Sequence, residues 1–139
     1  MGIKDFFSSV RTSATADTAP AKPRSSRKKG ADIERQAEAF LRKQGLTAVT
    51  RNYCIRGGEI DLIMRDGNVL VFVEVRYRRH SAHGSGAESI TRPKQLRLLK
   101  AAEHYLQKEY GSRLPDCRFD VISASGEPVQ FDWLKNVFG

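Results

Sequence analysis

The sequence predicts an α/β domain in which helices cover a β-sheet on both faces. Apolar residues recur at helical spacing from Asp32 to Gly45, and again in a longer segment that ends near Tyr110. Between these helices, residues 59–65 and 69–77 are two apolar segments joined by a short Asp-Gly-Asn turn, which is typical of a β-hairpin. Because both faces of these strands carry apolar side chains, the sheet needs a helix on each side.

The first helix is expected to begin at Asp32, where apolar residues start to recur three or four positions apart, and to end at Gly45. Residues 47–55 come next and are rich in β-branched and aromatic side chains, so they predict a strand. Arg56-Gly57-Gly58 then breaks the pattern and leads into the strand of residues 59–65. One helix therefore precedes three strands in the first part of the domain.

A long helix is expected after the loop of residues 78–90, which is rich in His, Ser and Gly and is expected to be mobile. Either Ser89 or Thr91 can cap this helix. Pro93 is tolerated in the first turn, and Gly111 ends the helix. Apolar side chains at helical spacing predict a buried stripe, which consists of Leu96, Leu99, Ala102, Leu106 and Tyr110.

A single domain, residues 30–139, is expected after a flexible basic extension, residues 1–29. The extension holds seven basic and two acidic residues and buries too little apolar surface to offset the entropy of ordering. Its Arg27-Lys28-Lys29 cluster is expected to be a solvated linker, with an arm that contacts nucleic acid as the alternative. Residues 117–124 predict a further strand, followed by a short terminal element. Four large apolar residues of that element are expected to pack: Phe131, Trp133, Leu134 and Phe138.

Composition restricts the class of protein. The formal net charge of the 139 residues is +8, so a polyanionic partner is allowed, but most of this charge lies in the extension. Cys54 and Cys117 have no metal-binding spacing and indicate a reducing compartment. No apolar segment is long enough to span a membrane, and no signal-peptide core is present. A cytoplasmic protein without a membrane partner is therefore expected.

Charged residues alternate within the two apolar strands of the hairpin. If Gly67-Asn68 forms a two-residue loop, Asp61 lies opposite Glu74 and Glu59 lies opposite Arg76, all on one face. A loop centred on Asp66-Gly67 would shift the pairing by two residues and keep the same faces, whereas a three-residue loop would put Asp61 and Glu74 on opposite faces. The same register assigns one apolar set to a single face: Ile60, Leu62, Val71, Val73 and Val75.

Buried carboxylates without a counter-charge are costly, so this cluster requires a cation. One solution is an ion-pair network with Arg76 and Arg56, in which Glu59 is expected to pair with Arg76. The other is a bound divalent cation. The three acids outnumber the nearby arginine, and surplus hard oxygen ligands favour Mg²⁺ or Mn²⁺.

The order of these motifs resembles a known group of enzymes. A helix carrying Glu34, then Gly58-Glu59-Ile60-Asp61-Leu62-Ile63, then Phe72-Val73-Glu74-Val75-Arg76 resembles the PD-(D/E)XK nuclease superfamily. That superfamily has the restriction-endonuclease-like fold, which archaeal Holliday-junction resolvases share. More narrowly, residues 30–138 are similar to the YraN family of uncharacterised bacterial proteins. Further matching segments are Arg51-Asn52, Lys94-Gln95, Arg97-Leu98 and residues 118–122.

The resemblance implies a central mixed β-sheet flanked by helices, and it assigns roles to individual residues. Asp61 and Glu74 would bind the metal, Mg²⁺ or Mn²⁺, and Glu34 would reach it directly or through water. The alternative for Glu34 is a solvated acid in the first helical turn. Arg76 stands where the superfamily usually has Lys; it stays charged and can stabilise phosphoryl charge but cannot act as a general base.

The expected function is metal-dependent phosphodiester hydrolysis of DNA, with branched or damaged DNA as the narrower expectation and a homodimer as one arrangement. Residues expected to contact nucleic acid are Arg56, Arg78, Arg79, Lys94 and Gln95. For the arginines at the end of the strand, a charged and protected sheet edge is the alternative. The rival functions are a non-catalytic nucleic-acid-binding module of the same fold and a protein-interaction adaptor that docks through the extension.

Overall fold

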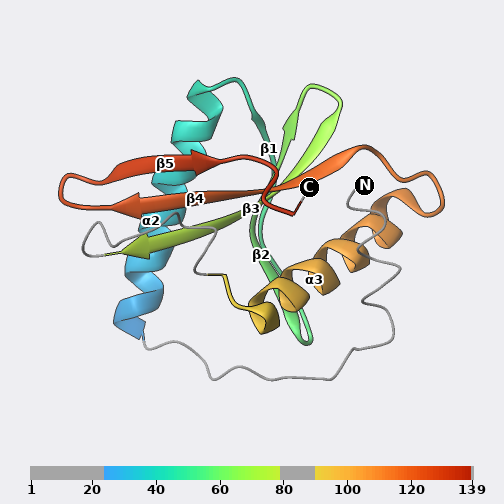
Figure 1. The fold of residues 1–139 in the computed structure, drawn as a ribbon, viewed down its shortest axis with the longest axis horizontal. Helices are drawn as coiled ribbons and strands as arrows, with labels where there is room; N and C mark the ends of the chain where they lie inside the picture. Colours follow the sequence, from blue (N-terminus) through green and yellow to red (C-terminus); the bar gives the residue numbers. More distant parts are fainter. Residues whose placement is uncertain (1–23, 79–89, 139) are drawn as a thin grey trace.

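The computed structural model describes residues 24–78 and 90–138 (Figure 1). It contains two helices and five strands in this range: α2 (Arg24–Lys43), β1 (Thr47–Ile55), β2 (Gly58–Asp66), β3 (Val69–Arg78), α3 (Arg92–Tyr110), β4 (Cys117–Ser125) and β5 (Gln130–Leu134). Arg79, Ser89 and most of the basic extension lie outside the described residues. The expectations for them stay predictions.

The five strands form one mixed sheet in the order β1-β2-β3-β4-β5. β1, β2 and β3 are antiparallel neighbours, β3 and β4 are parallel, and β5 returns antiparallel to β4. The parallel pair requires a crossover, which α3 supplies. The mixed α/β architecture predicted from the sequence is thereby confirmed.

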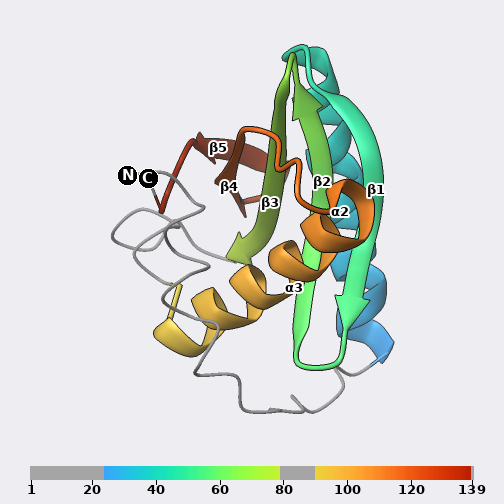
Figure 2. The ribbon, with the colours of Figure 1, turned by 90° about the vertical axis from the view of Figure 1, so that its right-hand side faces the viewer.

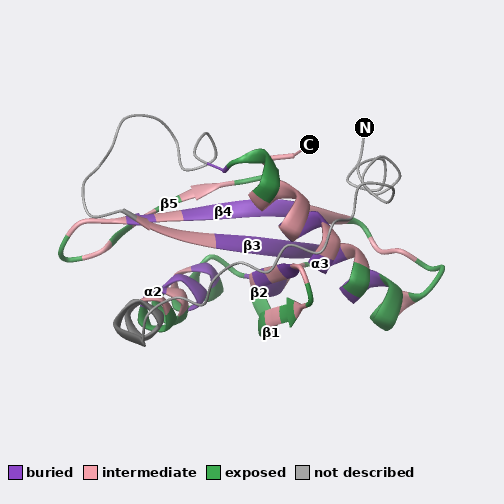
Figure 3. Ribbon diagram, turned by 90° about the horizontal axis from the view of Figure 1, so that it is seen from below, coloured by how far each residue is buried: buried purple, intermediate pink, exposed green. Residues whose placement is uncertain are grey.

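The two helices cover opposite faces of the sheet, and Figure 2 shows α3 crossing in front of the strands with α2 behind them. On one face Leu99 of α3 packs into a cluster with Phe72 and Phe119. On the other face Leu41 of α2 packs into a cluster with Val73. Because β3 and β4 are covered from both sides, they carry most of the buried colour in Figure 3. Burial on both faces explains why the first five residues of β3, Val69 to Val73, are all apolar.

The hairpin between β2 and β3 has the two-residue loop expected from Gly67-Asn68. Asp66 is opposite Val69, and Leu62 is opposite Val73. Gly67 has a φ of 61°, which is a left-handed conformation that glycine adopts without strain. The predicted register is therefore confirmed as far as the ladder extends.

The boundaries of α3 are also confirmed. Thr91 is its N-cap, and the Thr91 side chain accepts a hydrogen bond from the Lys94 backbone N–H. Pro93 lies in the first turn, and Gly111 ends the helix. The buried surface is wider than the predicted stripe, because the whole apolar side of α3 lies on the sheet. Its buried members are Leu98, Leu99, Ala101, Ala102, Tyr105 and Leu106, whereas Leu96 and Tyr110 are partly buried.

Two expectations about the fold are wrong. α2 begins at Arg24 rather than Asp32, because Lys and Arg favour helices nearly as well as alanine and no proline interrupts residues 24–31. Ile60 packs in the cluster on the α3 side rather than with Leu62. In β1, Asn52 has a φ of 49° and lies between Arg51 and Tyr53, the residues that pair with Leu62 and Ile60.

A buried aspartate ties the C-terminal part of the sheet together. Asp120 on β4 is 1% exposed, and its carboxylate accepts hydrogen bonds from Arg118 Nε at 3.0 Å and Trp133 Nε1 at 3.0 Å. It also accepts one from the Asn136 backbone N–H at 2.9 Å. Arg118 reaches further, to Asp66 in the β2–β3 hairpin, at 3.1 Å. One carboxylate thus connects the end of β5 to the hairpin.

We expect Asp120→Asn to lower the free energy of unfolding by about 3 kcal/mol, because it removes the charge from a buried ion pair and leaves Arg118 poorly compensated. Urea denaturation followed by circular dichroism measures this loss. Asp132→Asn is the matched control, since Asp132 is an exposed residue of β5. Equal stability of the two variants would contradict a structural role for Asp120.

Candidate active site

The ladder between β2 and β3 stops at the pair of Leu62 and Val73, and a side chain replaces the next backbone contact. Oδ2 of Asp61 accepts a hydrogen bond from the Val75 backbone N–H at 2.9 Å. This hydrogen bond holds Asp61 against β3, next to Glu74. Two carboxylates from neighbouring strands are therefore brought together, as the register predicted.

Glu74 is the most enclosed acid of this group, at 4% exposed. Its Oε2 atom lies 3.2 Å from Lys94 Nζ and has no further hydrogen-bond partner among the described residues. Burial, and then the neighbouring Asp61 carboxylate, raise the pKa of Glu74 well above its usual value, while Lys94 opposes this shift. Glu74 thus has a high cost of ionisation and Lys94 as its neighbouring cation.

The positive charges beside these acids come from the first turns of α3. Lys94 Nζ lies 3.2 Å from Glu59 Oε1, and Arg97 Nη2 lies 3.5 Å from the same oxygen. Burial lowers the pKa of the Lys94 ammonium, but the charges of Glu74 and Glu59 outweigh burial, so its pKa is raised overall. The expected pairing of Glu59 with Arg76 is therefore wrong: the hairpin carboxylates take their cations from the helix.

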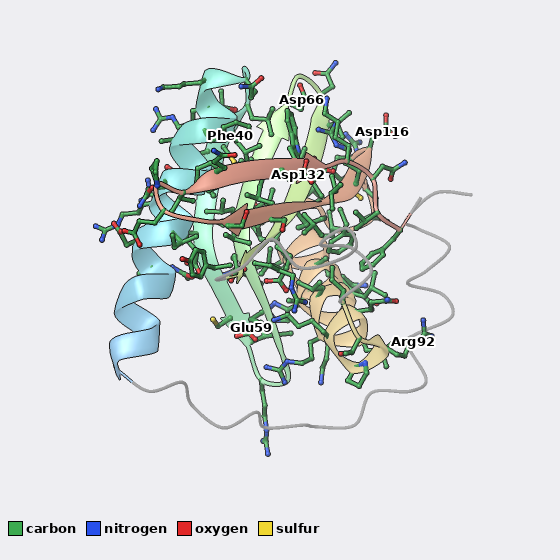
Figure 4. All side chains as sticks on the ribbon, turned by 60° about the vertical axis from the view of Figure 1, so that its left-hand side comes forward. Phe40, Glu59, Asp66, Arg92, Asp116 and Asp132 are labelled. Carbon is green, nitrogen blue, oxygen red and sulfur yellow. The ribbon has the colours of Figure 1, made fainter. Side chains whose placement is uncertain are left out.

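The spacing of Lys94 and Arg97 in the sequence could have indicated that both contact the same acid. Residues three apart in a helix share one face, and both side chains lie where α3 begins. The sequence does not say which strand this face meets. Figure 4 shows Glu59 at the same end of the sheet as Arg92, which opens α3, whereas Asp66 lies at the other end of β2.

A glycine allows this close approach between α3 and β2. A Cβ atom on Gly58 would lie 2.7 Å from the Arg97 carbonyl oxygen and 3.1 Å from the Ala101 nitrogen. Both are helix backbone atoms, which cannot move aside as a flexible side chain can. Gly58 therefore sets the separation at which Arg97 and Lys94 reach Glu59.

Glu34 approaches the same region from α2 on the other face. Desolvation, followed by the charges of Glu59, Asp61 and Glu34, raises the pKa of the Cys54 thiol. Three acids thus lie within electrostatic reach of one sulfur atom. Two further contacts, which the sequence analysis missed, hold α2 in place: Arg51 Nη2 donates to Glu38 Oε2 at 2.8 Å, and Arg51 Nε donates to the other oxygen of Glu38.

The remaining predicted site residues are spread around this centre. Arg76 is half-buried two residues after Glu74 on β3, and Arg56 is exposed in the β1–β2 turn. Gln95 donates from its side-chain amide to the Ile90 carbonyl at 3.2 Å, so this group has a structural partner. Arg78 ends β3, with its side chain outside the description. Their contacts with nucleic acid remain predictions.

The structure does not bring the three predicted metal ligands together as one cluster. Among residues 24–78 and 90–138, no three or more His, Cys, Asp or Glu side chains converge closely enough to form a metal cluster. Mg²⁺ commonly binds through one or two carboxylates, with water and substrate phosphates completing its octahedron. Asp61 and Glu74 are the two carboxylates that could hold an ion in that mode.

Fold and site together define a mixed α/β protein in which a buried glutamate and a half-buried aspartate face the basic first turns of a helix. Sequence comparison places it more narrowly. The profile of the uncharacterised protein family UPF0102 matches residues 33–124, and the chain belongs to this family. The narrower resemblance, to the YraN family, is thereby confirmed.

Relatives of the chain come from several bacteria. A UPF0102 protein of Vibrio cholerae serotype O1 is 53% identical over 112 residues, which cover 80% of this chain and 92% of the relative. A UPF0102 protein of Aeromonas hydrophila is 52% identical over 79% of this chain and 84% of its own length. One of Xylella fastidiosa is 43% identical over 78% and 90%, respectively. Within the described part of the chain, neither helix is long and apolar enough to cross a membrane.

We expect Gly58→Ala to destabilise the protein by about 1–3 kcal/mol, because the added methyl group overlaps the α3 backbone. Gly30→Ala in α2 is the matched control, since a Cβ atom there meets nothing within 4 Å. The control should gain about 0.5–1 kcal/mol from helix propensity. Urea unfolding of both variants tests this pair, and an equally stable Gly58→Ala protein would show that α3 does not rest on this glycine.

Ionisation of Glu74 should lower stability as the pH rises. Because the pKa of Glu74 in the folded protein lies above its ordinary value of 4.5, the folded state keeps a proton that the unfolded chain loses. The contribution of Glu74 to the free energy of unfolding therefore falls from pH 4.5 upward, until the pH passes the folded-state pKa.

Glu74→Gln stays neutral, so its free energy of unfolding should decline less over this pH range than that of the wild type. Urea denaturation at a series of pH values measures the difference. Glu127→Gln, in the exposed turn before β5, should follow the wild type. Parallel curves for the wild type and Glu74→Gln would show that Glu74 titrates normally.

Proposed function

We propose that this protein is a metal-dependent nuclease that hydrolyses phosphodiester bonds of DNA, and that its sheet and helices form a restriction-endonuclease-like fold. The observation that carries the proposal is the buried carboxyl group of Glu74 beside Asp61, two acids of neighbouring strands with Lys94 Nζ 3.2 Å from Glu74 Oε2. A protein that only needed structural charges would gain stability from replacing such a pair by apolar residues. Keeping it favours a functional role.

Different side chains would have different roles in this reaction. Asp61 and Glu74 would hold Mg²⁺ or Mn²⁺, and Glu34 would support the site through water. The bound ion would act as a Lewis acid and lower the pKa of a water molecule. Arg76, two residues after Glu74, would stabilise charge on the phosphoryl group without acting as a base. Lys94 and Arg97 add positive charge on the α3 side, where a polyanion would approach.

A second candidate function is a nucleic-acid-binding module that does not cleave. Two observations favour it: Arg76 replaces the usual lysine, and the acids already have Lys94 beside them. Such a module should bind DNA in the absence of metal, with an affinity that falls steeply as salt increases. It should not cleave DNA even after Arg76→Lys.

We expect Mg²⁺- or Mn²⁺-dependent cleavage when the protein is incubated with labelled duplex, single-stranded, branched and damaged DNA. Asp61→Asn and Glu74→Gln should each lower the rate about a hundredfold or more, because each removes a charged group at the reacting phosphate. Asp66→Asn is the matched control, since Asp66 lies at the opposite end of the same strand and pairs with Arg118.

The outcomes separate the two candidates. Cleavage that survives both substitutions would remove the acid pair from the mechanism. Binding without cleavage, in the wild type and in Arg76→Lys, would favour the second candidate. Cleavage by the wild type and by Asp66→Asn, but not by the two site variants, would support the nuclease.

A further inference from the structure

Lys94 lies between the two strands that carry the acids. Its Nζ atom is 3.2 Å from Glu59 Oε1 on β2 and 3.2 Å from Glu74 Oε2 on β3. The Lys94 side chain is 27% exposed to solvent, whereas the Glu74 side chain is 5% exposed. The ammonium group therefore separates the enclosed carboxylate from the more accessible side of the site.

The contact of Lys94 with Glu74 is suited to being broken. The contact is an ion pair of 3.2 Å, in which the carboxylate is almost fully buried while the Lys94 side chain stays partly exposed. The lysine ammonium group is carried on a flexible chain of four methylene groups, so it can move away from Glu74 without any movement of the backbone.

The surroundings of Lys94 permit this movement. The backbone N–H of Lys94 is bonded to the Thr91 N-cap, which keeps the helix end intact whatever the side chain does. Glu59 keeps Arg97 as a partner at 3.5 Å if Lys94 leaves. Glu74 is the acid that would lose its cation, and it lies beside Asp61.

We infer that Lys94 is the resident cation of the acid pair: it neutralises Glu74 in the metal-free protein and gives way to a divalent cation that binds Asp61 and Glu74. The inference rests on the proposed function, because it takes that metal site as given. Lys94 then competes with the metal instead of helping to bind it. Its removal should strengthen metal binding and weaken the metal-free fold.

The test compares the wild type, Lys94→Met and Lys100→Met by isothermal titration with Mn²⁺ at one pH and low salt. Lys94→Met should bind Mn²⁺ about tenfold more tightly than the wild type, since a positive charge next to the carboxylates is gone. Lys100→Met is the matched control, because Lys100 lies on the same helix, over Gly57, and this substitution removes the same net charge. It should bind as the wild type does.

Thermal unfolding gives a second readout. Without metal, Lys94→Met should unfold at a lower temperature than the wild type, and saturating Mn²⁺ should raise its midpoint more than that of the wild type. Because this variant is expected to be less stable, the wild type also provides a direct measurement. The ¹⁵N signal of the Lys94 ammonium should move toward that of a solvated lysine when Mg²⁺ is added.

The outcomes separate this inference from the proposed function. If the wild type binds Mn²⁺ and Glu74→Gln does not, the metal site stands. Equal or weaker binding by Lys94→Met would then overturn the inference alone, as would a Lys94 signal that ignores Mg²⁺. If neither the wild type nor Lys94→Met binds Mn²⁺, the metal site and the inference fail together.

Discussion

The contact between Gly58 and the backbone of α3 is the constraint on which the candidate site depends. A helix can lie this close to a strand only where no Cβ atom intervenes, and Gly58 supplies that gap opposite Arg97 and Ala101. The contact brings Lys94 and Arg97 against β2. The acids of β2 and β3 thereby have cations at ion-pair distance.

Charge balance around the acid pair follows from this packing. β2 and β3 contribute Glu59, Asp61 and Glu74, and α3 contributes two cations at 3.2–3.5 Å. The balance is uneven. Glu59 has two cationic partners on α3, whereas the more deeply buried Glu74 has Lys94 and an acidic neighbour. The excess of negative charge is therefore greatest where exposure to water is least, and there a cation gains most.

Much of the fold follows from local sequence patterns. Gly67-Asn68 fixes the register of β2 and β3, and Thr91 and Gly111 mark the ends of α3, because turn and cap preferences act over a few residues. The meeting of Asp61 and Glu74 follows from that register. The partners of Glu59 do not, because residues 35 and 38 positions apart meet only through the packing of a helix on a sheet. The division of Ile60 and Leu62 between two apolar clusters likewise coincides with the positive φ of Asn52 in another strand.

The hydrogen bond from the Val75 backbone to Asp61 has a further consequence. A surface aspartate samples several rotamers and loses that freedom when it binds a ligand. Asp61 is already held by β3, so its conformational entropy is lost during folding rather than during binding. The strand that carries Glu74 thus orients the carboxylate of its neighbour, which is preorganisation in the thermodynamic sense. The backbone of β3 thus fixes the Asp61 carboxylate in the folded protein.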